Sequence, residues 1–139
     1  MNQILPYSLW IGTSGDLHDF RRLYDLGIRG IVTLAYEEMP VALPRDFIVC
    51  RFPLMDGSDN DAELLRLAID TLTQLIAGKF ATLVCCQAGL SRSPGVTAAA
   101  LSRLSAEPFA ACLEQVALHR PCQIHPALFA QLQSLCAER

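Results

Sequence analysis

The amino-acid sequence predicts an α/β fold, with a single domain built on a central, mainly parallel sheet of four to five strands and helices on both faces. Segments that are apolar at almost every position alternate along the chain with longer segments of helical pattern. Strands of this kind are typical of parallel sheets buried on both sides. Of the 139 residues, 52% are apolar and 18% are charged, which is enough apolar material for one such core.

Each expected element lies between residues that begin or end regular structure. The strands are expected at residues 8–11, 30–35, 47–52 and 81–85. The helices are expected at residues 17–26, 62–77, 94–104, 109–118 and 126–136. Asp16 is placed to cap the first helix and Gly27 to end it, and Gly78 follows the second helix. Pro108 and Pro121 separate the later helices, because proline interrupts helical hydrogen bonding.

One loop of the chain carries the residues that indicate chemistry. The apolar strand at 81–85 leads directly into residues 86–93, Cys-Gln-Ala-Gly-Leu-Ser-Arg-Ser, and then into a helix that begins near Pro94. Gly89, in the middle of the loop, permits the positive φ that a backbone wrapped around an anion needs. A loop between a central strand and a helix N-terminus is where α/β folds bind anions. The sequence therefore predicts a phosphate site here.

The residue types in this loop suit phosphoryl transfer. The phosphate-binding residues expected are Gln87, Ala88, Gly89, Leu90, Ser91 and Arg92, mainly through their backbone N–H groups. The planar guanidinium of Arg92 adds a two-pronged contact that lysine cannot make. Amide donors, a helix N-terminus and a guanidinium together favour the ionised form of Cys86, which we expect to be a thiolate near neutral pH. A thiolate that faces a bound phosphate is a nucleophile.

With Cys86, Gly89, Arg92 and Ser93 at these spacings, the chain resembles the cysteine-based protein tyrosine phosphatase superfamily, and most closely its small (atypical) dual-specificity phosphatases. The signature of that family is His-Cys, two residues, Gly, two residues, Arg, then Ser or Thr. Further similar segments are residues 9–12, residues 25–28 and Arg120-Pro121 with Phe129. The resemblance thus covers nearly the whole chain and implies one catalytic domain over residues 1–139. The family histidine before the nucleophile, which organises the loop, is replaced by Cys85. The asparagine common in the closing segment is also missing.

The resemblance implies a metal-independent, cofactor-independent hydrolysis of phosphotyrosine, and of phosphoserine or phosphothreonine, in a protein or peptide substrate through a cysteinyl-phosphate. Asp56 matches the general acid of the family, and Ser93 matches the residue that donates a hydrogen bond to the leaving sulfur. Asp59 is the second candidate for the acid. Ser58, Asp59 and Asp61 also precede the helix at 62–77, where such residues cap a first turn.

Two other functions stay open at this point. The replacement of the family histidine by Cys85 is compatible with a phosphate-binding module that turns over weakly or not at all. A sulfurtransferase of the rhodanese type also uses a cysteine loop on an α/β fold, but it has no need for Asp56 or Ser93.

Composition narrows the range of partners. A formal net charge of −3 offers no basic patch for nucleic acid, and the loop at 86–93 has no lysine, which favours phosphoprotein over phosphoinositide substrates. Residues 1–7 lack the features of a signal peptide, and no apolar run reaches the length of a membrane span. We therefore expect a cytoplasmic protein without membrane partners, whose six cysteines are mostly reduced. Its oligomeric state is not indicated.

Several other cysteines and histidines have more than one interpretation. Zinc ligation is conceivable for the set Cys112, His119, Cys122 and His125, but the spacing matches no familiar zinc pattern. We expect Cys112 in the core and the histidines at the surface or at helix caps. Cys85 or Cys50 is a candidate redox partner for an oxidised Cys86, because a nearby thiol can trap a sulfenic acid as a disulfide.

Overall fold

A five-stranded sheet runs through the middle of the molecule, and the computed structural model describes residues 1–57 and 59–138. The strands are β1 (Asn2–Gln3), β2 (Leu9–Thr13), β3 (Gly30–Ala35), β4 (Ile48–Leu54) and β5 (Thr82–Cys86). They lie in the order β1-β2-β5-β3-β4. All neighbouring pairs are parallel except β1 and β2, which are antiparallel. The predicted fold class is therefore confirmed.

The central strand β5 places the cysteine pair at the carboxyl end of the sheet. All five of its residues are buried between β2 and β3. The register pairs Cys86 with Thr13 of β2 and Cys85 with Thr33 of β3. Because side chains alternate along a strand, Cys85 and Cys86 point to opposite faces of the sheet. Cys86 belongs to the larger core cluster and Cys85 to the smaller one.

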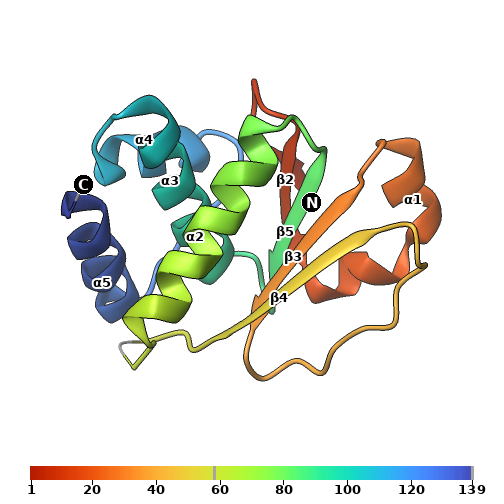
Figure 1. Ribbon diagram of the computed structural model, residues 1–139, viewed down its shortest axis with the longest axis horizontal. Coiled ribbons are helices and arrows are strands. Elements are labelled where there is room, and N and C mark those ends of the chain that lie inside the picture. Colours follow the sequence, from red (N-terminus) through yellow and green to blue (C-terminus); the bar gives the residue numbers. More distant parts are fainter. Residues whose placement is uncertain (58, 139) are drawn as a thin grey trace.

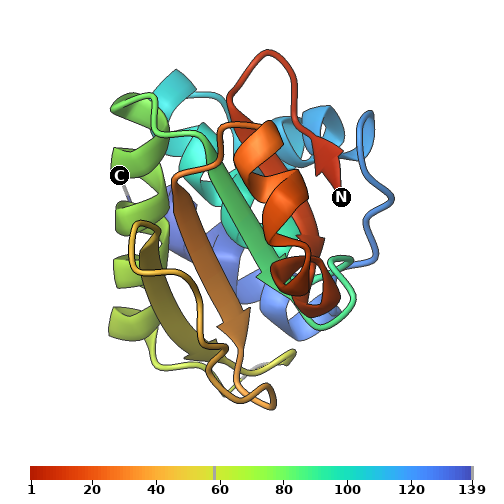
Figure 2. The same ribbon diagram turned by 90° about the vertical axis from the view of Figure 1, so that its right-hand side faces the viewer.

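Helices cover the two faces unequally (Figures 1 and 2). On one face lie α2 (Ala62–Ala77), α3 (Arg92–Ser105), α4 (Phe109–Ala117) and α5 (Pro126–Ala137). The other face carries only the 3-10 helix η1 (Ser14–His18) and the short helix α1 (Phe20–Asp25). The middle of the larger layer is α3, whose first eleven residues are all buried. Small side chains make this burial possible: a Cβ on Gly95 would lie 2.7 Å from Leu132 of α5.

The first predicted helix is the main correction to the expected elements. Residues 17–26 do not form one helix, because η1 ends at His18 and α1 begins at Phe20. Asp16 lies inside η1 and takes part in a capping box with Thr13, whereas Asp19 is the N-cap of α1 and accepts from the backbone N–H of Arg22 at 3.2 Å. Two capping residues so close together therefore divide the segment. The edge strand β1 was not predicted, since two residues are too few for a periodic signal.

The other boundaries agree closely with the expectations. The structure reproduces the strand at 30–35 and the helix at 62–77, with Gly78 as the C-cap of α2. The strand after Phe47 extends to Leu54, and α3 begins at Arg92 rather than at Pro94. In the described residues, no helix is long and apolar enough to cross a membrane.

Candidate active site

The predicted phosphate loop connects the carboxyl end of β5 to the first turn of α3, as expected. Gly89 has a φ of +68°, which confirms the conformation predicted for it. A Cβ at this position would lie 2.6 Å from the carbonyl oxygen of Gly12 and would also collide with the guanidinium of Arg120. Both the backbone angle and the surrounding space therefore require glycine.

Arg120 holds this loop from outside the pocket. Its Nε donates to the carbonyl of Gly89 and its Nη2 to the carbonyl of Ala88, both at 3.0 Å. Its Nη1 donates to Oδ1 of Asn2 at 2.9 Å. These contacts engage the carbonyls of two successive residues in the middle of the loop. The sequence indicated Arg120 only through the family resemblance, and this structural role was not predicted.

A pocket of about 400 Å³ opens at the loop and brings three segments together. Its lining residues are Asp56 from the loop after β4, residues 86–88 and 90–92 from β5, the phosphate loop and α3, and residues 123–126 before and at the start of α5. Of the four predicted catalytic residues, Cys86, Arg92 and Asp56 therefore share one pocket. Cys86 and Arg92 are only 3% and 4% exposed, so both lie at the bottom of the pocket.

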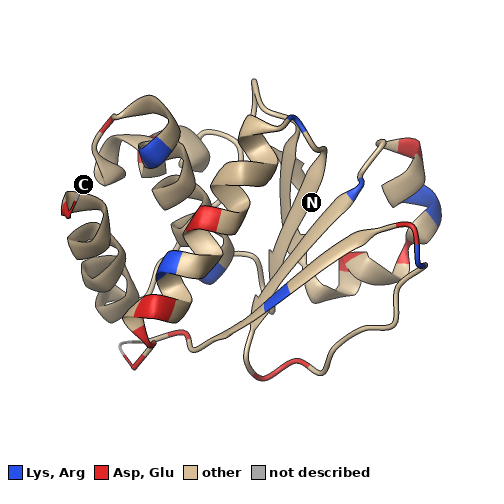
Figure 3. Ribbon diagram, viewed as in Figure 1, with Lys and Arg blue, Asp and Glu red and all other residues tan. Residues whose placement is uncertain are grey.

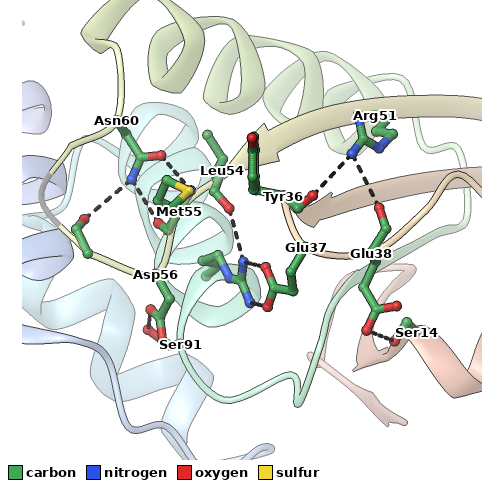
Figure 4. Close-up of polar contacts among 12 residues, drawn as sticks. Ser14, Tyr36, Glu37, Glu38, Arg51, Leu54, Met55, Asp56, Asn60 and Ser91 are labelled. Atoms are coloured by element: carbon green, nitrogen blue, oxygen red, sulfur yellow. Dashed lines mark hydrogen bonds and ion pairs between the residues drawn. The ribbon is translucent and has the colours of Figure 1, made fainter.

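Arg92 is held by a carboxylate that sequence reasoning missed. Glu37, in the loop after β3, accepts from Nη1 through Oε1 and from Nη2 through Oε2, both at 2.6 Å (Figure 4). Nη1 also donates to the carbonyl of Leu54 at 2.9 Å. The hydrogen bonds from Arg92 lower the pKa of Glu37, and those to Glu37 raise the pKa of Arg92. Within the described residues Nε of Arg92 is buried without a partner, and Nη2 uses only one of its two N–H groups, so two donors of the guanidinium remain for a ligand.

The loop that carries Glu37 is fixed by the neighbouring strand. Arg51 of β4 donates to the carbonyl of Glu38 at 3.3 Å and to that of Tyr36 at 3.5 Å. The N–H of Tyr36 donates to the carbonyl of Leu54 at 3.0 Å. Glu37 is thus presented to Arg92 by a loop with several backbone attachments, although its own side chain is 41% exposed.

Asp56 lies at the pocket edge and is exposed. Its Oδ1 accepts from the hydroxyl of Ser91 at 2.5 Å. Asn60 braces the turn around it, since its side chain accepts from the N–H of Met55 at 2.7 Å and donates to the carbonyls of Met55 at 2.9 Å and Gly57 at 3.3 Å. The loops after β3 and β4 both carry acidic residues (Figure 3). Asn60 is a positioning residue that the sequence did not reveal.

Of the acidic residues that follow Asp56, one caps the next helix and the other lies away from the described pocket lining. Asp61 is the N-cap of α2 and accepts from the N–H of Glu63 at 3.0 Å, as predicted. Asp59 does not line the described part of the pocket. Ser58, which was expected to help cap the same helix, lies outside the described residues.

Ser93 is fully buried in the first turn of α3, and its hydroxyl has no hydrogen-bond partner among the described residues. It does not line the pocket. Ser93 follows Arg92 on the helix that begins at the phosphate loop. Thr97, one turn further along the same helix, also has a buried hydroxyl without a partner among the described residues.

Cys85, at the position where the resemblance implies a histidine, is buried. Burial, followed by the nearby negative groups of Cys86, Asp16 and Glu38, raises its pKa to about 12. A cavity of about 20 Å³ adjoins both Cys85 and Cys86 on the face of the sheet that carries η1. Ser14 lies at the same cavity and donates to Oε1 of Glu38 at 3.2 Å. Cys85 thus lies beside a small cavity whose lining includes a hydroxyl and a carboxylate.

The Cys50 redox hypothesis and the zinc hypothesis find little geometric support. All six cysteines are free thiols. Strand β3 lies between Cys50 and the strand of Cys86. Two strand spacings are about 10 Å, whereas the Cα atoms of a disulfide lie within about 7 Å. In the described residues, no group of three or more His, Cys, Asp and Glu side chains could hold a metal. Cys112 is a core residue, and His125 caps α5 through Nδ1, which accepts from the N–H of Ala127 at 3.1 Å.

Comparison with known proteins identifies the fold. No protein-family model and no curated protein sequence matches the chain. Human DUSP28 has a TM-score of 0.87 and 23% identity, with 99% of this chain and 96% of that one covered. A mouse putative dual specificity phosphatase complexed with zinc tungstate has a TM-score of 0.86 and 23% identity, with 99% of this chain and 86% of that one covered. A human tyrosine phosphatase-like serine/threonine/tyrosine-interacting protein has a TM-score of 0.85 and 19% identity, with 99% of this chain and 96% of that one covered. The chain has the fold of the small dual-specificity phosphatases.

Proposed function

We propose that the protein is a metal-independent phosphatase that hydrolyses phosphotyrosine, and phosphoserine or phosphothreonine, in proteins or peptides through a cysteinyl-phosphate. The observation that carries this proposal is the single pocket lined by Cys86, Arg92 and Asp56, with the phosphate loop between them. The fold neighbours, among them dual-specificity phosphatases, support the same reaction class.

In the first step, the thiolate of Cys86 attacks phosphorus in line with the leaving oxygen. The loop N–H groups and the unpartnered Nε of Arg92 stabilise the charge on the equatorial oxygens. Asp56 gives its proton to the departing alkoxide or phenoxide oxygen. The P–O bond to the leaving group breaks as the S–P bond forms, and the products of this step are an alcohol or phenol and the cysteinyl-phosphate.

In the second step, water attacks the phosphorus of the cysteinyl-phosphate. The carboxylate of Asp56 now accepts the proton of that water, which returns it to its starting protonation state. The S–P bond breaks and inorganic phosphate leaves. The buried hydroxyl of Ser93 donates to the sulfur that leaves, which gives a partner to a group that otherwise has none among the described residues.

The charges of the pocket favour a monophosphate on a protein over a polyanionic headgroup. Arg92 is the one Lys or Arg side chain in the described pocket lining, and Glu37 already pairs with it. Asp56 adds a further negative group at the edge. A ligand with several phosphates would therefore bring more negative charge than the described lining can balance.

A phosphate-binding module without turnover is the second candidate. The observation that favours it is Cys85, which leaves a cavity beside the nucleophile in place of the family histidine. A sulfurtransferase is disfavoured, since a persulfide mechanism gives no reason for Asp56 to share the pocket with Cys86 and Arg92.

The test is hydrolysis of p-nitrophenyl phosphate and of a phosphotyrosine peptide, with chelator and reductant present, over a pH range around neutrality. Cys86→Ser is expected to abolish turnover, and Asp56→Asn to lower kcat by roughly 100-fold or more. Asp59→Asn, in the same acidic loop, is the matched control and should retain wild-type kcat. A wild type that binds vanadate but releases no phosphate would establish the binding module instead.

A further inference from the structure

We propose that Ser91 is a positioning residue whose hydroxyl holds the Asp56 carboxylate by Oδ1, so that Oδ2 is the oxygen that donates and accepts the proton. The inference rests on the proposed phosphatase function. It goes beyond the expected role of Ser91, which was to offer its backbone N–H to phosphate.

The first observation is that Ser91 does not use its hydroxyl in the usual way. It is the N-cap residue of α3, where a serine side chain ordinarily accepts from a backbone N–H of the first turn. No such cap hydrogen bond is present. The hydroxyl is directed instead to Asp56, 35 residues earlier in the chain.

The second observation is that the hydroxyl hydrogen of Ser91 is available to the Asp56 carboxylate. The hydroxyl oxygen accepts from the backbone N–H of His125 at 3.0 Å. A hydroxyl has a single hydrogen, and an N–H cannot receive it, so the hydrogen is available for Oδ1 of Asp56 at 2.5 Å. Ser91 thus joins the acid loop, the phosphate loop and the start of α5 through one 8% exposed side chain.

The third observation is that no other described group restrains this carboxylate. Among the described residues, Ser91 is the hydrogen-bond partner that the structure gives to the Asp56 side chain. Asn60 braces only the backbone on either side of it. An exposed aspartate with one free torsion beyond Cβ would otherwise sample several orientations.

This arrangement suits both chemical steps. While Asp56 is protonated on Oδ2, its Oδ1 remains an acceptor for Ser91, and the proton passes from Oδ2 to the leaving oxygen. After that transfer the carboxylate keeps the same hydrogen bond, and Oδ2 takes a proton from the attacking water. Ser91 loses no proton and forms no covalent bond in either step.

The experiment compares Ser91→Ala and Ser91→Thr on two aryl phosphates, one with a good and one with a poor leaving group. A misplaced acid harms the poor leaving group more, because that group depends on protonation. Ser91→Ala is expected to lower kcat roughly 10- to 30-fold on the poor leaving group and at most about threefold on the good one. Ser91→Thr keeps the hydroxyl and is expected to restore most of the rate.

Further variants test whether Ser91 acts through Asp56. Because both changes would act through the same proton transfer, Ser91→Ala in an Asp56→Asn background should add at most about twofold. Ser105→Ala is the matched control: its hydroxyl donates to the Leu101 carbonyl near the end of α3, at 2.8 Å, and its loss should leave both substrates unchanged. Ser91→Gly, which costs little at an N-cap, replaces Ser91→Ala if the alanine variant unfolds.

The results distinguish a failure of the Ser91 inference from a failure of the proposed phosphatase function. A uniform loss on both substrates, or a loss confined to vanadate affinity, would show that Ser91 serves only the shape of the loop. An additive loss in the Asp56→Asn background would overturn the inference in the same way. A wild type inactive on both substrates would instead reject the phosphatase function.

Discussion

The two ends of the phosphate loop are held very differently. At the α3 end, Arg92 is paired through both terminal nitrogens with Glu37, and the adjacent Ser91 is bonded to Asp56. At the β5 end, no side-chain hydrogen bond to Cys85 or Cys86 is found in the part of the chain that the structure describes, and a cavity adjoins both thiols. The position of Arg92 is thus set by side-chain hydrogen bonds, whereas that of Cys86 is set by its strand and by core packing.

This difference indicates where the chain can tolerate change. A planar guanidinium in a two-bond contact with a carboxylate has one orientation, so its replacement should be severe. Cys85 has no such side-chain contact among the described residues but is held in the strand β5, so a substitution there should have a smaller effect. Three variants test this contrast, from the largest expected effect to the smallest.

The largest effect is expected at Arg92. Lysine keeps the positive charge but loses the planar donors, so Arg92→Lys should lower kcat/KM for p-nitrophenyl phosphate by roughly 1,000-fold. Arg103→Lys is the control, because Arg103 pairs with Asp70 away from the pocket lining. A loss of less than about tenfold in Arg92→Lys would mean that charge alone suffices and that the Glu37 contact does not set the geometry.

An intermediate effect is expected at Glu37. Glutamine can accept only through one oxygen, so Glu37→Gln should lower kcat/KM by roughly tenfold and the Tm at pH 7 by roughly 3–6 °C. The pKa of Glu37 is lowered mainly by the Arg92 hydrogen bonds. A carboxyl with a lowered folded pKa adds stability that is present above its ordinary pKa of 4.5 and lost as the pH falls through the folded value.

Thermal unfolding at several pH values therefore checks the Glu37 account. The Tm difference between wild type and Glu37→Gln should shrink as the pH falls below the ordinary carboxyl range, where Glu37 itself becomes protonated. Glu38→Gln is a neighbouring control, because the Glu38 carboxylate accepts from the hydroxyl of Ser14 rather than from Arg92. A Tm difference that stays constant from neutral to acid pH would contradict the account.

The smallest effect is expected at Cys85. Cys85→His would extend into the cavity that Ser14 and Glu38 also line, where Ser14 offers a hydroxyl and Glu38 a carboxylate acceptor to an imidazole. We expect kcat/KM to rise roughly three- to tenfold, since the loop would gain a contact at its cysteine end. Alkylation of Cys86 by iodoacetamide, measured with and without vanadate, reports on the same end directly. If Cys85→His lowered both kcat/KM and the rate of Cys86 alkylation, Cys85 would be a packing residue whose thiol does not limit catalysis.

Much of the fold could be predicted from the sequence, because its signals are local. Apolar runs and capping residues located β3, α2 and α5 within about two residues, and Gly89 signalled the positive φ in the loop. The split of residues 17–26 was missed because Asp16 and Asp19 both have capping chemistry, and a helical pattern does not say which one acts.

The candidate site could be predicted less completely, because its supports come from distant parts of the chain. The pocket contains Cys86, Arg92 and Asp56, as predicted, since each has a motif or a family counterpart. Glu37 is 55 residues from Arg92 and lies in a loop that has no motif. The contacts of Arg120 with the phosphate loop span 31 and 32 residues. Such pairings follow from the order of the strands, which a single sequence does not reveal.

The most direct test of the central claim is the isolation of the cysteinyl-phosphate. Wild-type protein is mixed with a phosphotyrosine peptide, quenched in acid within one turnover, digested and examined by mass spectrometry. The account predicts one added phosphoryl group on the peptide that contains Cys86, and none in Cys86→Ser. Phosphate release without any adduct, or an adduct on Cys85 in its place, would contradict it.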